Sequence, residues 1–548
     1  MMDISEFDKT LPVSKEVRLP KHPFSTIADD PCRFEAEVYN YFAWAPLYED
    51  DTFANGDGCI DAVRIQDGHA DFKQRYVRTE RFVIERAARQ AVFGKYRNRY
   101  TDDPRVKHKI HSTANTHIIY FENQLLALKE DSLPYALNPD TLATKGPYDF
   151  HGHFSSKTHT AHPKIDHATG EMITMGYEAK GDSTTDIVYY LFDKNGNKLE
   201  ECWISAPFAG MMHDMAATDK WIVFVLPPLA IVPLDLLEKG HHHFAWDEEK
   251  PLMLGILPRR NPKPEDVWWF STKSAFLGHT GNAFDGEDGC FWFFPPIGKP
   301  PIPPQTPLQD MHGGYVRFKL DPNAADTTVK PTKLIDLAGE MPKVDDRYLT
   351  KQYNNVFMCH HATLSGEPST GGAWNSISRC DLATGEYTHW CAGPSTVLEE
   401  VAFIPRSPDA PESDGYVITM ACRQDKFITS ILILDTAKLA EGPIAMIELP
   451  FRLRLGIHGS WVPAERLPER KELCDMEGVT DEILQEFQNK SVTIPKLSYT
   501  AMPPFHPPPK AFPRPPGGPP GPPGAPKQPP GPPHHPPGDP PSENSDFK

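Results

Sequence analysis

TAHPKIDHATGE, residues 160–171, is the stretch from which the fold of this chain is inferred. It joins a His-Pro step to an Asp-x-x-Thr-Gly-Glu turn, and the segment before it already contains several histidines. Pro163 holds the backbone of His162 extended and removes a backbone hydrogen-bond donor at the next position. We therefore expect His162 at the end of a strand, with its ring pointing to where the strand stops.

Three later histidines have a similar setting. They are His213 in MMHD, His279 in GHTGNAF and His458 in IHGSWVP. Each lies between an apolar run and a turn, and the four are so far apart in sequence that only a closed ring of strands can bring them together. Imidazole binds iron, copper, nickel and zinc, so the four rings predict a metal site without choosing the metal.

The pattern of apolar runs predicts such a ring. Short runs separated by turns begin at Ile118, with hairpins over 118–128 and 187–197, and similar units continue to residue 449. The helix predicted over 79–93, with Thr79 as its cap, precedes them. An all-β closed array follows, and a propeller matches it best, although the repeats are too diverged to give a blade count.

Composition narrows the class of protein. The 548 residues carry a net charge of −18, which argues against a nucleic-acid or anionic-membrane partner. Nine cysteines, never spaced as Cys-x-x-Cys, indicate reduced thiols rather than disulfides or a zinc site. The first residues do not resemble a signal peptide, and prolines interrupt the most apolar run, 221–237. We expect a cytoplasmic protein without a transmembrane segment.

The chain divides into three expected parts. Residues 1–50 form an extended N-terminal arm, 51–502 the β-propeller catalytic domain, and 503–548 a disordered tail rich in proline. A partner that reads proline motifs can dock on such a tail, but a plain tail is the preferred interpretation. A second proline run, 295–307, is expected to be a surface loop.

These motifs resemble the carotenoid cleavage oxygenase family, and within it the lignostilbene-α,β-dioxygenase branch. The resemblance runs from about residue 50 to residue 463, and its matching segments, in the order of the family, are ALKEDS (127–132), TAHPKIDHATGE (160–171), GYEAKG (176–181), MHD (212–214), NAF (282–284), GEMP (339–342) and HGSWVP (458–463). It implies a seven-bladed β-propeller with a small helical or loop cap and one Fe(II) on the axis. The implied iron ligands are His162, His213, His279 and His458.

The resemblance also implies three glutamates that hydrogen-bond the outer nitrogens of three of these rings. By motif they are Glu130, Glu340 and Glu400, with Glu399 as a competing choice beside Glu400. A carboxylate in this place fixes the tautomer and aims the ring at the metal. Four ligands leave two positions open on an octahedral iron, which oxygen activation next to a bound substrate requires. The triplet His241–His243 is interpreted as surface, and no dinucleotide-binding motif follows a predicted strand.

Two further residues concern the substrate. In the stilbene-cleaving branch, a lysine at the position of Lys129 and a tyrosine at that of Tyr96 bind the 4-hydroxyl group, although nearby Tyr100 can be confused with Tyr96. Phe53 is a weaker candidate for stacking on the substrate ring. An ammonium beside a phenol favours the phenolate, which can push electron density into the alkene. Without the resemblance, Lys129 is interpreted as an exposed lysine at a strand end.

The predicted function is the cleavage of the interphenyl C=C bond of hydroxylated stilbenes, such as resveratrol or lignostilbene, by O2 to give two aromatic aldehydes. One alternative is cleavage of apocarotenoid polyenes, or of propenyl-phenols such as isoeugenol and coniferyl alcohol. Another is a non-catalytic propeller scaffold whose tail recruits partners.

For Lys129 and Glu130 to serve one site, their strand must bend or end there, because adjacent side chains of a strand point to opposite faces.

Overall fold

The computed structural model describes residues 55–66, 69–286, 291–293, 314–362, 374–454 and 456–467. All of them belong to one compact unit, Met1–Cys474. The predicted arm, the proline-rich tail, the 295–307 loop and Phe53 lie outside the described residues. Cysteines in the described part are free thiols, as expected from their spacing.

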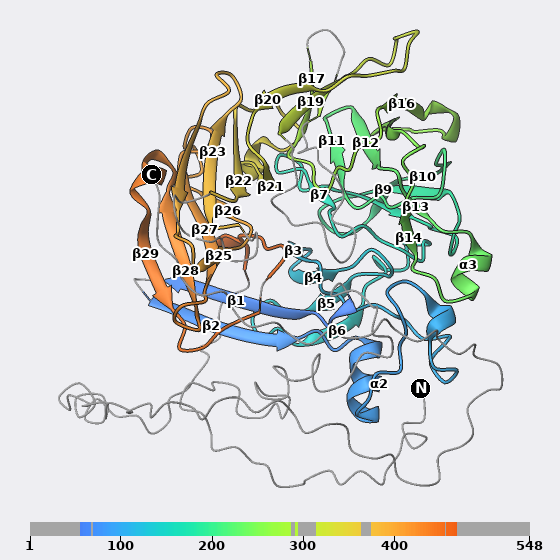
Figure 1. Cartoon of the computed structure of the whole chain (residues 1–548), viewed down its shortest axis with the longest axis horizontal. Helices are drawn as coiled ribbons and strands as arrows, with labels where there is room; N and C mark the ends of the chain where they lie inside the picture. Colours follow the sequence, from blue (N-terminus) through green and yellow to red (C-terminus); the bar gives the residue numbers. More distant parts are fainter. Residues whose placement is uncertain are drawn as a thin grey trace, which may run out of the picture. The chain divides into compact units, whose positions relative to one another are not determined.

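Antiparallel sheets of four strands dominate this unit (Figure 1). The first two sheets contain β3 (His117–Phe121), β4 (Gln124–Leu128), β5 (Tyr135–Leu137) and β6 (Thr144–Pro147), then β7 (Lys164–Ile165), β8 (Met172–Tyr177), β9 (Asp186–Phe192) and β10 (Lys198–Ser205). The third contains β11 (Met215–Ala217), β12 (Trp221–Leu226), β15 (Leu252–Pro258) and β16 (Trp268–Thr272). The two hairpins predicted from the apolar runs are present as β3–β4 and β9–β10.

The remaining sheets continue the series along the chain. The fourth and fifth contain β17 (Ala283–Asp285), β18 (Phe291–Phe293), β19 (Tyr315–Leu320) and β20 (Thr332–Ile335), then β21 (Gly339–Lys343), β22 (Asn355–His360), β23 (Ser376–Asp381) and β24 (Tyr387–Cys391). The sixth sheet has five strands, which are β25 (Thr396–Leu398), β26 (Ala402–Pro405), β27 (Gly415–Arg423), β28 (Ile428–Asp435) and β29 (Pro443–Glu448). Two hairpins are separate, β1 (Cys59–Gln66) with β2 (His69–Tyr76), and β13 (Leu229–Ile231) with β14 (Phe244–Trp246).

Each sheet packs face to face on the next, which makes the array a propeller. Leu128 of β4 shares a core with Val188 of β9, and further cores join each later pair of neighbours up to the sixth sheet. Both faces of an inner sheet are therefore buried, and β9 is buried continuously after Asp186 rather than at alternate residues. This explains why the apolar runs, not alternation, revealed the strands.

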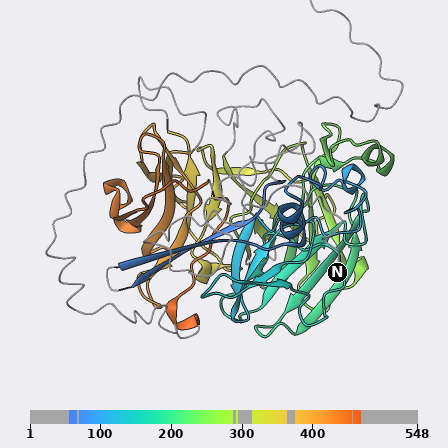
Figure 2. The same cartoon turned by 90° about the horizontal axis from the view of Figure 1, so that it is seen from below.

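Hairpin β1–β2 closes the ring between the last sheet and the first. Val63 and Phe72 pack against the core of the sixth sheet, whereas Ile60 packs with Ala127 and Leu137 of the first. In both views the hairpin runs between these two sheets (Figures 1 and 2). The segments that begin and end the described chain thus meet in space.

The expected number of seven blades is corrected by this arrangement. The described residues form five four-stranded sheets, one five-stranded sheet and the closing hairpin, rather than seven blades of four strands. The resemblance implied seven blades, but in the described part the place between the sixth sheet and the first holds only two strands. The all-β propeller class itself is confirmed.

Helices are few among the described residues. Thr79 caps α2 (Glu80–Ala88) by accepting a hydrogen bond from the Phe82 amide, as predicted. The helix ends before 93 because Arg89 has a positive φ of 53° and the amide of Phe93 donates to the Glu85 side chain instead. The second helix, α3 (Leu234–Glu238), is a single turn and a half. No helix in the described ranges is long and apolar enough to cross a membrane.

A buried ion-pair network anchors residues 160–171, which contain His162. The Arg259 guanidinium, which is 3% exposed, donates to Asp166 and to Glu171 over 2.8 Å each. Arg259 follows β15, so the network ties the turn between β7 and β8 to the next blade.

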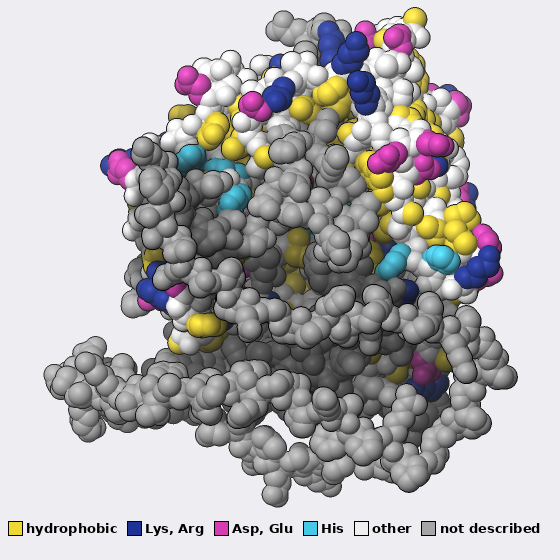
Figure 3. Space-filling model, in the orientation of Figure 1, with side chains coloured by type: hydrophobic (Ala, Val, Ile, Leu, Met, Phe, Trp, Pro, Cys, Tyr) yellow, Lys and Arg dark blue, Asp and Glu magenta, His cyan; other side chains and the backbone are white. Residues whose placement is uncertain are grey.

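On the face shown in Figure 3, acidic and basic side chains are interspersed over the coloured residues, which fits a protein whose charge serves solubility.

Candidate metal centre

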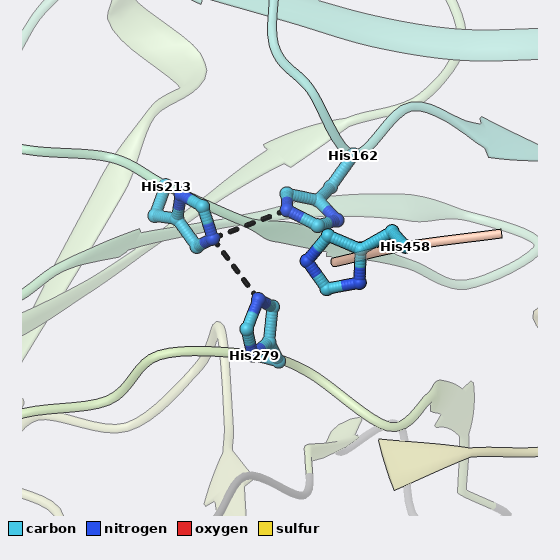
Figure 4. Close-up of side chains that lie close together, drawn as sticks. All are labelled: His162, His213, His279 and His458. Carbon is cyan, nitrogen blue, oxygen red and sulfur yellow. Dashed lines mark hydrogen bonds between the residues drawn. The ribbon is translucent and has the colours of Figure 1, made fainter. Parts of the chain in front are cut away.

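Four histidines from four blades turn their rings toward one point (Figure 4). His162 lies just before β7, His213 just before β11 and His279 before β17, while His458 follows β29. One ring nitrogen from each lies within 4.8 Å of the others. The predicted position of His162 at a strand end is thus corrected to the residues that lead into a strand.

The contacts among these rings fit a bound cation. Nε2 of His213 lies 3.1 Å from Nε2 of His162 and 3.0 Å from Nε2 of His279. Since Nδ1 of His213 and of His279 each face a carboxylate, these Nδ1 atoms are the donors and both Nε2 atoms carry lone pairs. Lone pairs that face each other at this distance repel unless a cation lies among them. Nε2 of His458 is buried without a hydrogen-bond partner.

Burial supports the same conclusion. Desolvation, reinforced by the neighbouring imidazoles, lowers the pKa of His162 well below its usual value. The ring is therefore neutral, as a metal ligand must be. The four converging imidazoles therefore fit a metal site by their donor set and geometry.

Each predicted glutamate lies behind a different ring. Glu130 accepts a hydrogen bond from Nδ1 of His213, Glu340 accepts one from His279 over 2.9 Å, and Glu400 one from His458 over 3.1 Å. Glu399 instead accepts the Gly456 amide at 2.8 Å. Among the described residues, no carboxylate hydrogen-bonds the ring of His162, so the four ligands are not equivalent.

The charges of these carboxylates are held by their partners. Burial alone would raise the pKa of Glu130, but His213 and Arg97 bring it down to about 2. His279 likewise lowers the pKa of Glu340 against the effect of burial. Lys343 and His458 do the same for Glu400. All three side chains are thus ionised and accept from the rings, which raises the basicity of the ligand nitrogens.

Asp214 fixes the backbone of two ligands, a role that sequence reasoning missed. Its carboxylate accepts the amide of Thr280, the residue after His279, at 2.7 Å, and Lys164 donates to it at 2.7 Å. Because Asp214 follows His213 directly, it holds these two histidine loops together. The motif MHD contained this signal, since an acidic residue beside a ligand can satisfy the backbone amides of a neighbouring loop.

His117 was also missed. Its Nδ1 lies 2.9 Å from the carbonyl oxygen of Ala161, and its ring centroid is 5.5 Å from that of His162 and 5.4 Å from that of His458. It does not belong to the group of four converging nitrogens. Burial, with the neighbouring His458, lowers its pKa to about 3, so this ring is a neutral packing neighbour of two ligands.

Lys129 and Tyr96 lie together near this centre. Strand β4 ends at Leu128, so Lys129 and Glu130 leave the strand and can serve one site. The Lys129 ammonium lies 4.5 Å from the centroid of the Tyr96 ring, and it donates to Oδ1 of Asn115 at 2.9 Å. Lys129 is only 4% exposed, so its interpretation as an exposed lysine is wrong.

The pKa values of this pair move in opposite directions. Burial lowers the pKa of Lys129, although Asp131 and Glu130 oppose the shift. Burial and the charge of Glu130 raise the pKa of Tyr96 well above its usual value, so Tyr96 keeps its proton. Tyr100 is not part of this pair. It lies in the short helix η3 (Arg99–Thr101), where burial and the charge of Asp182 raise its pKa.

We expect replacement of Glu130, Glu340 or Glu400 by glutamine to weaken metal binding or turnover by roughly 10–100-fold, the usual effect of losing a hydrogen-bond partner of a ligand. Glu130 should show the largest loss, because its second hydrogen bond comes from a side chain, the Tyr177 hydroxyl at 2.5 Å. The second hydrogen bonds of Glu340 and Glu400 come from backbone amides. Metal affinity of each variant, measured by titration of the metal-free protein, checks this.

Glu399→Gln is the matched control for Glu400→Gln. It is adjacent and also buried, and burial raises its pKa to about 7, but it contacts no ligand ring. Metal affinity should therefore be unchanged in Glu399→Gln. An effect of Glu399→Gln with none of Glu400→Gln would show that the wrong carboxylate is assigned to His458.

Comparison with known proteins identifies relatives over most of the chain. The family model described as retinal pigment epithelial membrane protein matches residues 39–463. A resveratrol cleavage oxygenase of Aspergillus fumigatus is 40% identical over 450 residues, which cover 78% of this chain and 89% of the relative. An isoeugenol monooxygenase of Pseudomonas putida is 38% identical over 424 residues, covering 75% and 87%.

A solved structure agrees with these relatives. The crystal structure of lignostilbene dioxygenase from Pseudomonas brassicacearum superposes with a TM-score of 0.73 at 37% identity. It covers 77% of this chain and 90% of that chain. The similarity therefore extends over the propeller as a whole.

Proposed function

Because the chain belongs to the retinal pigment epithelial membrane protein family, which is the carotenoid oxygenase family, we propose that it cleaves the interphenyl C=C bond of hydroxylated stilbenes. The reaction consumes O2 and gives two aromatic aldehydes. The family and the lignostilbene branch that the motifs predicted are confirmed, and with them the class of alkene-cleaving oxygenases.

The observation that carries the substrate assignment is the buried Lys129–Tyr96 pair beside the metal centre. Tyr96 keeps its proton and can donate a hydrogen bond to the 4-oxygen of a phenolic substrate. The Lys129 ammonium, whose pKa burial lowers, can donate a hydrogen bond to the same oxygen and favour the phenolate form of the substrate. The negative charge is delocalised through the ring to the alkene carbon that reacts with oxygen.

The proposed metal is Fe(II), held by His162, His213, His279 and His458. Neutral imidazoles are ligands of several metals, and iron is the one whose redox chemistry suits reaction of an alkene with O2. When bound, Fe(II) supplies that oxygen chemistry. The protein supplies the orientation of the rings through Glu130, Glu340 and Glu400, and the position of the phenol through Lys129 and Tyr96.

Two other reactions compete with this proposal. Isoeugenol carries the same 4-hydroxyl group, and an isoeugenol monooxygenase is among the relatives, so propenyl-phenols remain the second candidate. An apocarotenoid has no phenol and would gain nothing from Lys129 and Tyr96. A non-catalytic scaffold would not need four converging histidines.

Iron content and oxygen uptake separate an enzyme from a scaffold. Metal-free protein is loaded with Fe(II), and oxygen consumption is followed with a 4-hydroxystilbene such as resveratrol. The proposal expects about one iron per chain, the stoichiometry of a single four-histidine site, and uptake that depends on both iron and stilbene. Protein that binds no Fe(II) and consumes no oxygen would restore the scaffold hypothesis.

Deletion of Pro513–Lys548 should leave the cleavage kinetics unchanged. The proposal places catalysis within residues 51–502, in a cytoplasmic enzyme, and a segment this rich in proline and glycine builds no part of a preformed site. Steady-state kcat and KM of the truncated and full chains check this. A large fall in kcat would place the tail at the substrate entrance.

A further inference from the structure

Two pairs of consecutive residues, Tyr96–Arg97 and Lys129–Glu130, contact each other: Tyr96 meets Lys129, and Arg97 meets Glu130. Lys129 lies 4.5 Å from the centroid of the Tyr96 ring. Nη1 of Arg97 lies 3.9 Å from Oε2 of Glu130, whose other oxygen accepts the hydrogen bond from His213. The first members thus meet at the proposed substrate end, and the second members meet behind a metal ligand.

Arg97 is held rigidly in this place. Its Nη1 donates to the Tyr177 hydroxyl at 2.9 Å and its Nη2 donates to Glu178 at 2.5 Å. The guanidinium carbon lies 4.6 Å from the centroid of the Tyr177 ring. The Tyr177 hydroxyl in turn donates to Oε2 of Glu130 at 2.5 Å. Arg97 therefore reaches Glu130 both directly and through Tyr177.

Arg97 forms ion pairs with two buried carboxylates, Glu130 and Glu178. The side chains of Arg97, Glu130 and Glu178 are only 4%, 3% and 2% exposed. A buried carboxylate without a partner is unfavourable. Glu178 also accepts hydrogen bonds from the ring of His243 at 2.8 Å and from the Ser183 amide at 2.6 Å. His243 is buried, so its predicted surface position is wrong.

The backbone at both ends of this ion pair is strained. Arg97 has a φ of 55° and Glu178 a φ of 51°, a left-handed conformation that non-glycine residues seldom adopt. Such conformations persist where the surrounding structure requires them, and they cluster at functional sites. Because Arg97 directly follows Tyr96, the left-handed turn lets one side chain face Lys129 and the next face Glu130.

We propose that Arg97 is a positioning residue of the metal centre, which holds the Glu130 carboxylate in the orientation that fixes the ring of His213. The inference rests on the proposed metal site. It assigns Arg97 no contact with substrate or metal, because its action passes through Glu130 and Tyr177. The same guanidinium joins the metal end of the site to the substrate end, since its neighbour Tyr96 carries the phenol contact.

Cobalt(II) titration of the metal-free protein tests this without any turnover. The absorption bands of bound cobalt report both affinity and ligand geometry. Arg97→Met should weaken cobalt binding by roughly 10–100-fold, as expected when the partner of a ligand is lost, and should change the bands. The cobalt affinity of Arg97→Lys should lie between those of the wild type and Arg97→Met, because lysine keeps the charge but lacks the planar guanidinium.

Arg99→Met is the matched control. Arg99 lies two residues away and pairs with Asp182 at 2.7 Å, but its side chain is 51% exposed. An exposed pair contributes little, so cobalt affinity should stay at the wild-type value. If Arg97→Met binds cobalt like Arg99→Met, the proposal is wrong.

A double-mutant cycle separates positioning from general stability. Arg97→Met combined with Glu130→Gln should bind cobalt about as weakly as Glu130→Gln alone, because both changes act through one carboxylate. Losses that add would contradict the proposal. If Arg97→Met does not fold, the cycle is run with Arg97→Lys and decides in the same way. Cobalt binding that depends on Arg97 in a protein that cleaves no stilbene would overturn the proposed substrate and leave this inference standing.

Discussion

Replacement of His213 with alanine is expected to leave the propeller folded but without metal, and turnover should fall below detection. Nε2 of His213 lies near the nitrogens of both His162 and His279, so its loss opens the centre of the ligand set. The fold should survive because each pair of neighbouring sheets buries its own core. Iron content per chain and the melting temperature measure the two effects separately.

The same result is expected for alanine at His162, His279 and His458. His151→Ala is the control, because the side chain of His151 is 54% exposed and pairs with Glu122, and His151 is not among the four converging histidines. That variant should keep its iron and its activity. Near-normal activity of any of the four alanine variants would remove that histidine from the site.

Lys129→Met and Tyr96→Phe should lower kcat/KM for 4-hydroxystilbenes by roughly 10²–10⁴-fold, the range for loss of a proton-transfer partner, while iron content stays at the wild-type value. Neither side chain is placed among the converging nitrogens, so metal binding does not depend on them. Methylation of the 4-hydroxyl of the substrate should mimic both variants, because it removes the proton that the pair handles.

Tyr100→Phe is the control for Tyr96→Phe. Tyr100 is the nearby tyrosine of the same motif, but it lies in η3 rather than beside Lys129. The Tyr100→Phe variant should cleave 4-hydroxystilbenes at the wild-type rate. A 4-methoxystilbene cleaved as fast as resveratrol would refute recognition of the phenol and favour the polyene alternative.

The sequence allowed the four histidines and the three glutamates to be located because each stands in a short local motif. Their meeting in space required only that strands close into a ring, which the apolar runs from Ile118 onward predict. The pairing of Glu400 rather than Glu399 with His458 depended on a single residue of register, which only the structure shows.

Other parts of the site depend on tertiary contacts that no local motif reveals. Burial of Lys129 comes from the elements packed around the end of β4, whereas periodicity alone indicated a strand-end lysine in solvent. Arg97 meets Glu178 across 81 residues of sequence. The blade count failed for a similar reason, because a two-stranded hairpin closes the ring in place of a full blade.

The central claim is that this chain cleaves the interphenyl double bond of a phenolic stilbene. Its most direct test is incubation of the iron-loaded protein with resveratrol, lignostilbene, isoeugenol and a β-apocarotenal in air, with products identified by mass. The account predicts 4-hydroxybenzaldehyde and 3,5-dihydroxybenzaldehyde in equal amounts from resveratrol. Intact resveratrol and lignostilbene, with aldehydes formed from isoeugenol or the β-apocarotenal, would contradict it.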